Sequence, residues 1–433
     1  MDQGAGEEGH IMAHAAPKVV VIGLGYVGLP LAFEAVFAGL ECVGFDNSPD
    51  VTDQINSGHS HVDDVADTAV QRMLDAGFRA TTDSAVLSRG DVIAICVPTP
   101  LSTEGGPDLS AVRAAARVIA EHLVSGQLVV LESTTYPGTT EEVLVPILET
   151  SGLTAGRDFN VAFSPERIDP GNEQFGVRNT PKVVGGLTPE CSQRVSEFYA
   201  HFVEDVVVAK GVREAEMTKL LENTYRHVNI ALVNEMAQFC HELNIDLWDS
   251  IRCASTKPFG FQAFLPGPGV GGHCIPIDPN YLSHRVKTHL GQPFRFVELA
   301  QEINAGMPLY VVRRIQDLLN GIGKPVKGSK VALLGVTYKP DISDQRESPA
   351  VQVAEALMNL GALVSYQDPF VSNWSIGGSL VSRHGDVEGA LHSADITVLL
   401  QAHRSYDLAL LSSSESLVLD TRGVLSGPSV NRL

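Results

Sequence analysis

The sequence predicts an α/β protein in which two domains, each with a parallel sheet covered by helices, flank a helical middle with a long central helix. Short β-branched runs alternate with helical stretches from residue 18 onward. The pattern then becomes helical over 213–245, and no comparable strand run follows before residue 323. The alternation restarts at "SKVALLGVTYKP". Strands that alternate with helices are typical of parallel sheets with both faces covered.

Seven short runs rich in valine and isoleucine predict the strands of the first domain. They are "KVVVIG", "ECVGFD", "DVIAICVP", "QLVVLEST", "NVAFSPE", "KVVGG" and "DVVVAK". We expect residues 17–212 to form this domain. Residues 1–16 are acidic and rich in glycine and alanine, so we expect them to form a flexible tail.

Two long helices are predicted for the middle domain, residues 213–323. The second, "FRFVELAQEINAGMPLYVVRRIQDLLNGI", contains Pro308, which we expect to kink or divide it because proline removes a backbone hydrogen bond. Residues 324–433 are predicted to form the last domain. Its strands are expected in "SKVALLG", "ALVSYQDPF", "DITVLLQ" and "SLVLDTRG".

Composition limits the partners and the compartment. The 433 residues carry a formal net charge of -20, which disfavours nucleic acid and anionic membranes as partners. No run reaches the roughly eighteen apolar residues of a membrane helix, and the acidic start does not resemble a signal peptide. Six scattered cysteines without a CxxC pair favour a reducing compartment over disulfides or structural zinc. We expect a cytoplasmic protein without a metal.

Gly23, Gly25 and Gly28 form a GxGxxG motif directly after a predicted strand. The first glycine permits a tight turn, the second lets the backbone approach a pyrophosphate, and the third allows close packing. The next strand ends in Asp46, where a carboxylate would hold a ribose diol and repel a 2′-phosphate. The motif predicts a Rossmann-type domain that binds NAD in preference to NADP. The alternative is a tight turn without a ligand.

Polar residues follow three further strands of this domain. They are Thr99, Ser133, Thr134 and Glu166. Ligands of open α/β sheets bind at the carboxyl ends of strands. Ser and Thr are also ordinary turn residues, so it is the shared location of these side chains that indicates a site.

Lys219 and Asn223 lie four residues apart on the first middle helix and therefore share one face. The alternative for Lys219 is a solvated surface charge.

Cys274 follows two glycines and His273 in the loop "PGVGGHCIPIDP". Glycine-rich backbone leaves a sulfur accessible and offers N–H donors to a thiolate, which favours a nucleophile. Asp278 lies four residues further on, where a carboxylate could relay a proton. The alternative is a buried loop cysteine.

Cations follow two strands of the last domain. The segment "LLGVTYKPDISDQRESP" lacks the second and third glycines of a dinucleotide site, and Lys339 and Arg346 stand at its turn. Arg422 follows a later strand. Lys and Arg in so acidic a chain suggest recognition of phosphate. The alternative is a solvated loop in which they pair with neighbouring carboxylates.

Six blocks of sequence in fixed order carry a family resemblance. They are "GLGYVGLPLA", "ESTTYPGTTEE", "FSPERIDPGN", "KLLENTYRHVNIALVNE", "PFGFQAFLPGPGVGGHCIPIDP" and "GVTYKPDISDQRESPA". Together they resemble the nucleotide-sugar 6-dehydrogenases, the family of UDP-glucose and UDP-N-acetylhexosamine dehydrogenases, from about Lys18 to Arg422. The resemblance implies an NAD domain, a helical dimerisation domain and a Rossmann-like domain for the UDP part of the substrate.

The resemblance also implies a reaction. The C6 alcohol of a UDP- or dTDP-hexose or N-acetylhexosamine would be oxidised to a carboxylate in two NAD-dependent steps. Cys274 resembles the nucleophile that traps the aldehyde as a thiohemiacetal, which then becomes a thioester. Lys219 and Asn223 resemble the pair that stabilises the alkoxide and oxyanion, and Asp278 resembles the proton acceptor. Thr134 and Glu166 resemble the residues that handle the hydrolytic water.

Binding residues follow from the same motifs. The motifs and the resemblance together imply that the cofactor is bound by Gly23, Gly25, Tyr26, Val27, Gly28, Asp46, Thr99, Ser133, Thr134 and Arg346, the last as a phosphate contact from the other domain. The resemblance implies that the substrate is bound by Glu166, Lys219, Asn223, Phe264, Leu265, Tyr338, Lys339 and Arg422. The resemblance implies a homodimer or a higher homo-oligomer.

Three departures from the glucose-type pattern bear on the substrate. Pro170 stands where a second glutamate is usual, His273 replaces a small residue, and no arginine matches near Pro258. The first two, with "KPFGFQAF", resemble the N-acetylhexosamine branch. Two other functions stay open: a single-step NAD-dependent hydroxyacid or sugar dehydrogenase, and a non-catalytic module that senses NAD and nucleotide sugars.

Overall fold

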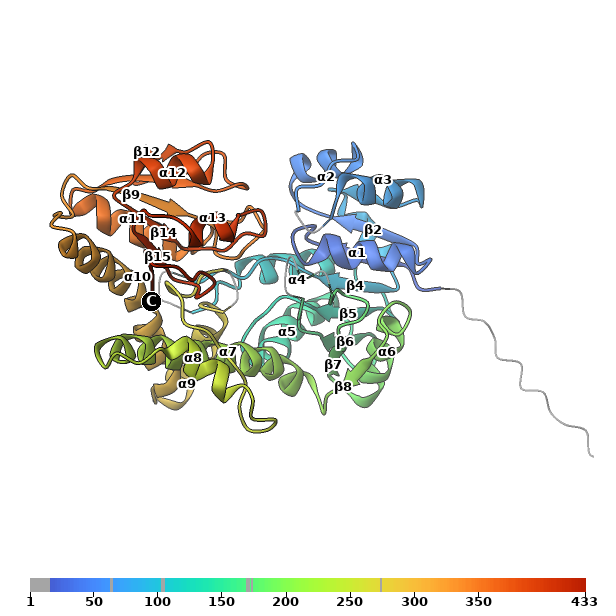
Figure 1. Ribbon diagram of the computed structural model, residues 1–433. Helices are drawn as coiled ribbons and strands as arrows, with labels where there is room; N and C mark the ends of the chain where they lie inside the picture. Colours follow the sequence, from blue (N-terminus) through green and yellow to red (C-terminus); the bar gives the residue numbers. More distant parts are fainter. Residues whose placement is uncertain (1–15, 63–64, 103–105, 169–171, 173, 273–274) are drawn as a thin grey trace, which may run out of the picture. The chain divides into compact units, whose positions relative to one another are not determined.

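The computed structural model describes residues 16–62, 65–102, 106–168, 172, 174–272 and 275–433 (Figure 1). The chain forms two compact units. The first contains Met1–Thr99 and Leu109–Glu216, and the second contains Pro100–Asp108 and Met217–Leu433.

The first unit is built on an eight-stranded sheet. Its strands are β1 (Val19–Ile22), β2 (Cys42–Phe45), β3 (Arg79–Thr81), β4 (Val92–Ile95), β5 (Leu128–Leu131), β6 (Asn160–Phe163), β7 (Lys182–Gly186) and β8 (Val206–Val208). Their order is β3-β2-β1-β4-β5-β6-β7-β8. The strand order reverses between β1 and β4, which is the point where ligands bind to doubly wound sheets.

The predicted parallel pairing holds from β3 through to β6, but β7 runs antiparallel to β6. Among the described residues between β6 and β7 there is no helix of the kind that usually joins parallel strands. The short strand β3 had no counterpart among the predicted runs. It begins with an exposed arginine, which masks the strand pattern in the sequence.

Helices cover the first sheet. They are α1 (Gly28–Phe37), α2 (Pro49–Asn56), α3 (Asp67–Asp75), α4 (Ser110–His122), α5 (Val145–Leu148) and α6 (Pro189–Tyr199), with a π-helical turn at Thr140–Leu144 and 3₁₀ turns at Ser84–Arg89 and Glu149–Ser151. The strands β1, β4 and β5 are buried along their whole length. Burial on both faces explains their continuous apolar sequences.

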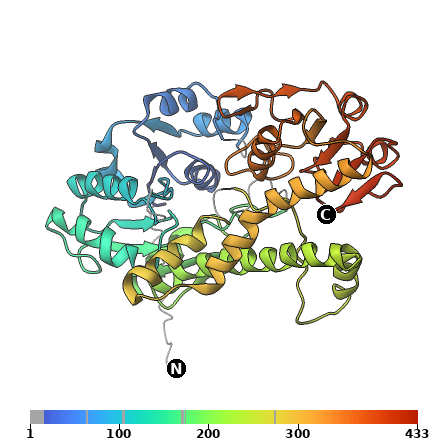
Figure 2. The ribbon, with the colours of Figure 1, turned by 90° about the vertical axis from the view of Figure 1, so that its left-hand side faces the viewer.

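The second unit begins with long helices. They are α7 (Val212–Glu242, whose first turn belongs to the first unit), α8 (Leu247–Ala254), α9 (Asp278–Leu290) and α10 (Arg295–Gly321). Figure 2 shows α7 and α10 side by side, and their buried amides Asn234 and Asn304 are joined by a 2.9 Å hydrogen bond. Pro308 lies inside α10 and does not divide it. No described strand lies between α7 and residue 323.

A second sheet follows in the same unit. Its strands are β9 (Lys330–Leu334), β10 (Leu363–Gln367), β13 (Ser382–Arg383), β14 (Ile396–Leu399), β15 (Val418–Asp420) and β16 (Val430–Arg432), with helices α11 (Pro349–Asn359), α12 (Val387–Ser393) and α13 (Leu408–Ser412) and a hairpin of β11 (Ser375–Ile376) and β12 (Ser379–Leu380). The order β13-β10-β9-β14-β15-β16 repeats that of the first six strands of the first sheet. The predicted fold class, two α/β domains around a helical middle, is confirmed.

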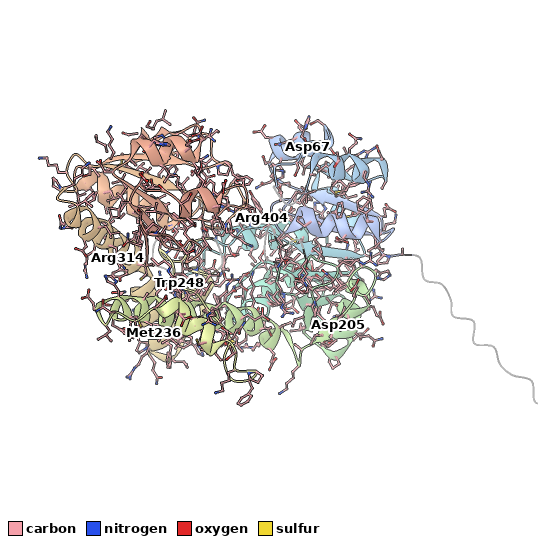
Figure 3. The ribbon with its side chains drawn as sticks, viewed as in Figure 1. Asp67, Asp205, Met236, Trp248, Arg314 and Arg404 are labelled. Carbon is pink, nitrogen blue, oxygen red and sulfur yellow. The ribbon has the colours of Figure 1, made fainter. Side chains whose placement is uncertain are left out.

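The end of the chain is attached to α8. Trp248, labelled in Figure 3, donates from its indole to the Leu433 carbonyl at 3.4 Å, and Arg432 pairs with Asp246 at 2.8 Å. These contacts join the second sheet to the helical part of the same unit. Among the described helices, none has the length and apolar character that crossing a bilayer requires.

Candidate active site

The GxGxxG turn lies between β1 and α1. Gly23 has a φ of +85°, and a Cβ there would lie 2.9 Å from the Cys96 carbonyl oxygen. A Cβ on Gly28 would lie 1.9 Å from the Gly23 carbonyl oxygen, so both positions require glycine. A Cβ on Gly25 would meet nothing within 4 Å, and α1 has no side-chain cap at Val27. Open space and uncapped N–H groups at a helix N-terminus fit a pyrophosphate.

Asp46 directly follows β2 and is held by the turn. Its Oδ2 accepts from the Leu24 N–H at 2.9 Å and its Oδ1 from the Ser48 N–H at 3.0 Å. A carboxylate has lone pairs beyond these two bonds, so Asp46 can still accept from a ribose. Tyr26, on the same turn, is 39 % exposed. These residues fit NAD.

Three of the predicted polar residues meet at the ends of β4 and β5. The Thr99 hydroxyl donates to the Thr134 carbonyl at 2.8 Å. The Ser133 hydroxyl is buried and donates to the Val97 carbonyl at 2.7 Å. These bonds tie the two strand ends together, and the predicted NAD contacts of the three residues stay predictions.

Glu166 follows β6 beside a buried charged cluster. Its Oε1 accepts from the Ile168 N–H at 2.6 Å, and its Oε2 lies 3.9 Å from Lys182 Nζ. The Lys182 ammonium donates to Glu132 at 2.7 Å, and the Tyr199 hydroxyl also donates to Glu132. Lys182, Glu132 and Tyr199 are all buried. Glu166 therefore faces a cation that is already paired.

The charges of this cluster depend on one another. Burial raises the pKa of Glu132, against the lowering influence of Lys182. Burial lowers the pKa of Lys182, but Glu132 and Glu166 outweigh it, so the pKa of Lys182 is raised and the ammonium persists. Sequence reasoning missed Glu132 and Lys182. Their signal was a charged residue at the end of an apolar strand, in "VVLEST" and "PKVVGG".

A second cluster joins α7 to the start of α9. Asn223 donates from Nδ2 to Asp278 Oδ2 at 2.6 Å, and Lys219 Nζ lies 4.0 Å from the same oxygen. Lys219 is only 8 % exposed, so the alternative of a solvated surface charge is wrong. The shared face predicted for Lys219 and Asn223 is confirmed because both reach one carboxylate.

Asp278 is buried, and its pKa reflects this. Burial raises the pKa of Asp278 to about 6, although Lys219 and Asn223 both lower it. At neutral pH the group is mainly ionised and is a stronger base than a solvated aspartate. A buried carboxylate with an ammonium and an amide donor beside it suits proton acceptance from an alcohol.

The segment before the cysteine is packed against the last domain. A Cβ on Gly271 would lie 2.6 Å from the Glu347 carbonyl oxygen, and one on Gly272, whose φ is +89°, would lie 2.6 Å from the Tyr338 ring. These glycines are required for close approach. The predicted nucleophile Cys274 and its neighbour His273 lie outside the described residues, as do Asp169 and Pro170.

Two apolar residues that were predicted to bind substrate, Phe264 and Leu265, precede these glycines. The Phe264 ring packs edge-on against Tyr225 of α7, with centroids 5.8 Å apart, whereas Leu265 is 55 % exposed. Phe264 is thus anchored to α7, and Leu265 is accessible to a ligand.

Arg422 follows β15 and approaches the glycine segment. Its Nε donates to the Leu400 carbonyl at 2.6 Å, and a Cβ on Gly267 would lie 3.1 Å from its Nη1. Burial lowers the pKa of Arg422 to about 10, so it stays cationic at neutral pH. Its position fits an anionic ligand near the segment that leads to Cys274.

Tyr338, Lys339 and Arg346 lie between β9 and α11. The Tyr338 carbonyl accepts from Gln401 at 2.6 Å, and Arg346 pairs with Asp344 at 2.6 Å. The N-terminus of α11 is capped by Ser348, unlike that of α1. This turn therefore differs from the GxGxxG turn, and the predicted reach of Arg346 to a cofactor stays a prediction. Within the described part of the chain, no three His, Cys, Asp or Glu side chains gather as a metal site would require.

Family models match most of the chain. The UDP-glucose/GDP-mannose dehydrogenase family matches with its NAD binding domain over residues 17–203, its central domain over 213–306 and its UDP binding domain over 332–427. The NAD domain thus contains the GxGxxG turn, and the UDP domain contains Lys339 and Arg422.

Individual relatives agree over nearly their whole length. The UDP-N-acetyl-D-mannosamine dehydrogenase of Pyrococcus horikoshii is 33 % identical over 420 residues, 95 % of this chain and 97 % of the relative. An NDP-N-acetyl-D-galactosaminuronic acid dehydrogenase of Ralstonia nicotianae is 35 % identical over 94 % of this chain and 96 % of its own. The solved UDP-D-ManNAc dehydrogenase of Pyrococcus horikoshii superposes with a TM-score of 0.86 at 32 % identity, covering 96 % of this chain and 98 % of that one. The chain belongs to the UDP-glucose/GDP-mannose dehydrogenase family and is an NAD-dependent oxidoreductase of the nucleotide-sugar dehydrogenase type.

Proposed function

We propose that the chain oxidises the C6 alcohol of a UDP-N-acetylhexosamine to the carboxylate. The overall change is CH₂OH + 2 NAD⁺ + H₂O → COO⁻ + 2 NADH + 3 H⁺, so four electrons leave the sugar. Two departures from the glucose-type pattern, His273 and Pro170, favour the N-acetylhexosamine over glucose. The Pyrococcus and Ralstonia relatives, whose names carry an N-acetylated hexose, support the same choice.

The observation that carries the proposal is the cluster of Lys219, Asn223 and Asp278. Loss of hydride from an alcohol requires that its proton leave, and the alkoxide that forms requires positive charge or donors. Asp278 accepts the proton through water, and Lys219 and Asn223 stabilise the negative oxygen. NAD⁺ at the GxGxxG turn supplies hydride acceptance in both oxidations.

Cys274 provides the covalent link between the two oxidations. Its thiolate adds to the C6 aldehyde and gives a thiohemiacetal, which loses a hydride and a proton to become a thioester. Water activated by Glu166, with Thr134 as its second contact, adds to the thioester carbonyl. The C–S bond breaks, the carboxylate is released and the thiol is restored. This covalent stage keeps the aldehyde from diffusing away.

The test is the NADH yield per sugar. Purified protein is incubated with limiting UDP-N-acetylglucosamine, UDP-N-acetylmannosamine, UDP-glucose or the matching dTDP sugars and excess NAD⁺. Two NADH per N-acetylhexosamine support the proposal. One NADH with a carbonyl product indicates a single-step dehydrogenase, and no NADH with tight binding of both ligands indicates a sensing module.

We also propose that the enzyme is a homodimer built through α7. Leu221, Tyr225, Leu232 and Phe239 are exposed on this helix. The last three recur at intervals of seven residues, which places them on one stripe of the helix. An exposed apolar stripe of this kind is suited to a second copy of the same helix.

A further inference from the structure

The turn after β9 is attached to the end of β14 by side chains that the family resemblance does not assign. The imidazole of His403 is almost fully buried. Its Nδ1 accepts from the Asp341 N–H at 2.9 Å, and its Nε2 lies 3.1 Å from Asp368 Oδ2. Two residues earlier, Gln401 donates to the Tyr338 carbonyl at 2.6 Å. Lys339 lies between these two attachment points, Tyr338 and Asp341.

The second sheet has an aspartate, Asp368, at the position that corresponds to Asp46 of the first sheet, but its set of hydrogen-bond partners differs. Asp368 follows β10 as Asp46 follows β2, and the two carboxylates have matching backbone bonds. Asp368 Oδ2 accepts from the Val336 N–H at 2.7 Å and Oδ1 from the Phe370 N–H at 2.8 Å. Asp368, however, is completely buried and is also bonded to His403. Asp368 therefore binds His403 instead of a ribose, which is the ligand that a carboxylate at this position holds in a dinucleotide site.

The hydrogen bonds determine the tautomer of His403. Because Nδ1 accepts a backbone N–H, the ring proton belongs on Nε2, from which it is donated to Asp368. Asp341 adopts a left-handed backbone conformation with a φ of +63°, which is costly for a residue other than glycine. Arg404, labelled in Figure 3, holds the Asp341 carboxylate at 2.7 Å from its Nε. The turn thus depends on its neighbours to keep its shape.

We propose that His403 is a positioning residue for nucleotide binding. It connects the buried Asp368 to the left-handed turn at Asp341 and so holds Tyr338 and Lys339 where they meet the nucleotide diphosphate. The proposal rests on the proposed function in taking Lys339 as a nucleotide contact. A turn held in its binding conformation before the ligand arrives loses less entropy on binding.

Two substitutions separate the two hydrogen bonds of the imidazole. In His403→Asn the side-chain oxygen can take the place of Nδ1 and accept from Asp341, but the contact with Asp368 is lost. In His403→Gln the amide can reach Asp368 from the place of Nε2, but the acceptor for Asp341 is lost. Both variants remove the ring and are expected to lower the melting temperature to a similar extent.

The measurement is calorimetric titration of the full-length protein with UDP. We expect His403→Gln to weaken UDP binding about tenfold, because it leaves the turn without its buried acceptor, and His403→Asn to stay within about threefold of wild type. Hydrogen exchange of the peptide 337–344 should be faster in His403→Gln than in His403→Asn. Equal affinities in the two variants, or losses that follow only the melting temperature, would overturn the proposal.

Two further variants serve as controls. One tests the turn at an exposed side chain, where misfolding is not expected, and the other tests whether Lys339 contacts the nucleotide. Arg404→Ala removes the second attachment of Asp341 at a side chain that is 66 % exposed, and we expect a loss of UDP affinity of about threefold with an unchanged melting temperature. If the Arg404→Ala variant and the His403→Gln variant both bind UDP as tightly as wild type, the positioning role of His403 is wrong. Lys339→Ala tests the site itself: if it binds UDP as wild type does, the assignment of Lys339 fails, independently of His403. NAD⁺ titration of each variant reports whether the first unit remains folded.

Discussion

The rate of the proposed reaction should depend on the protonation state of Asp278 near neutral pH. Because burial raises its pKa to about 6, we expect kcat/KM to fall about tenfold for each pH unit below 6, where the protonated acid no longer accepts a proton. Asp278→Asn should lose most activity and this acidic limb. A pH–rate profile from pH 5 to 8 checks this, and a limb that persists in Asp278→Asn at the same pH would assign the titration to another group.

The same pKa predicts the direction of a stability change. The folded-state pKa of Asp278, about 6, lies above the ordinary aspartate pKa of 3.8, so the folded protein binds the proton more tightly than the unfolded chain. The contribution of Asp278 to stability therefore declines as pH rises from about 4 to 6. The melting temperature of Asp278→Asn, relative to wild type, should rise over this window and then level off. A difference that is constant from pH 4 to 7 would contradict the raised pKa.

Lys219 influences Asp278 as well as any bound oxyanion. It is the largest of the influences that lower the pKa of Asp278, so Lys219→Met should raise that pKa above 6. The melting-temperature difference between Lys219→Met and Lys219→Met/Asp278→Asn, followed from pH 4 to 9, reports the shift. Lys287→Met is the matched control, since Lys287 is an exposed lysine on α9 and should leave the titration in place. If Lys219 acted only on the substrate, Lys219→Met would also leave the Asp278 pKa unchanged, and this result would contradict the prediction.

At the scale of elements, a buried ion pair joins β5 to β7. Lys182→Met leaves the buried carboxylate of Glu132 without its cationic partner, and we expect it to cost about 3–5 kcal/mol of unfolding free energy. The double variant Lys182→Met/Glu132→Leu should recover most of this loss because no buried charge remains unpaired. Chemical denaturation of both variants measures the coupling. Lys210→Met, at an exposed lysine beyond β8, should change the free energy by less than about 0.5 kcal/mol.

The elements that could be predicted from the sequence are those whose own residues determine them. Apolar runs such as "KVVVIG" and the helical pattern of α7 carry their periodicity within the segment. The antiparallel direction of β7 depends instead on the path of a connection without a described helix. The burial of Lys182 and Lys219 depends on carboxylates far along the chain. A lysine in a sequence does not show whether Glu132 or Asp278 will reach it, so the ion pairs could not be predicted.

At the scale of the whole molecule, the second sheet repeats the order of the first six strands of the first sheet, but the turns at their strand ends differ. The first leaves the N-terminus of α1 without a side-chain cap and Asp46 partly exposed, while the second caps α11 with Ser348 and buries Asp368. One topology thus supplies an open dinucleotide turn and a closed turn braced by His403. Strand order alone therefore does not determine the ligand, and the residues at the carboxyl ends of the strands do.

The proposed dimer gives the last prediction. The exposed apolar side chains at Tyr225, Leu232 and Phe239 share one stripe of α7, and a charge there would be buried against the second copy without a partner. We expect Leu232→Glu to halve the mass measured by light scattering, to that of a single 46.3 kDa chain. Val207→Glu, at an exposed apolar residue of β8, introduces the same charge away from α7 and should leave the mass unchanged. If the wild-type protein is monomeric, the proposed dimer does not exist. If Leu232→Glu keeps the wild-type mass, the subunit contact does not lie on this stripe of α7.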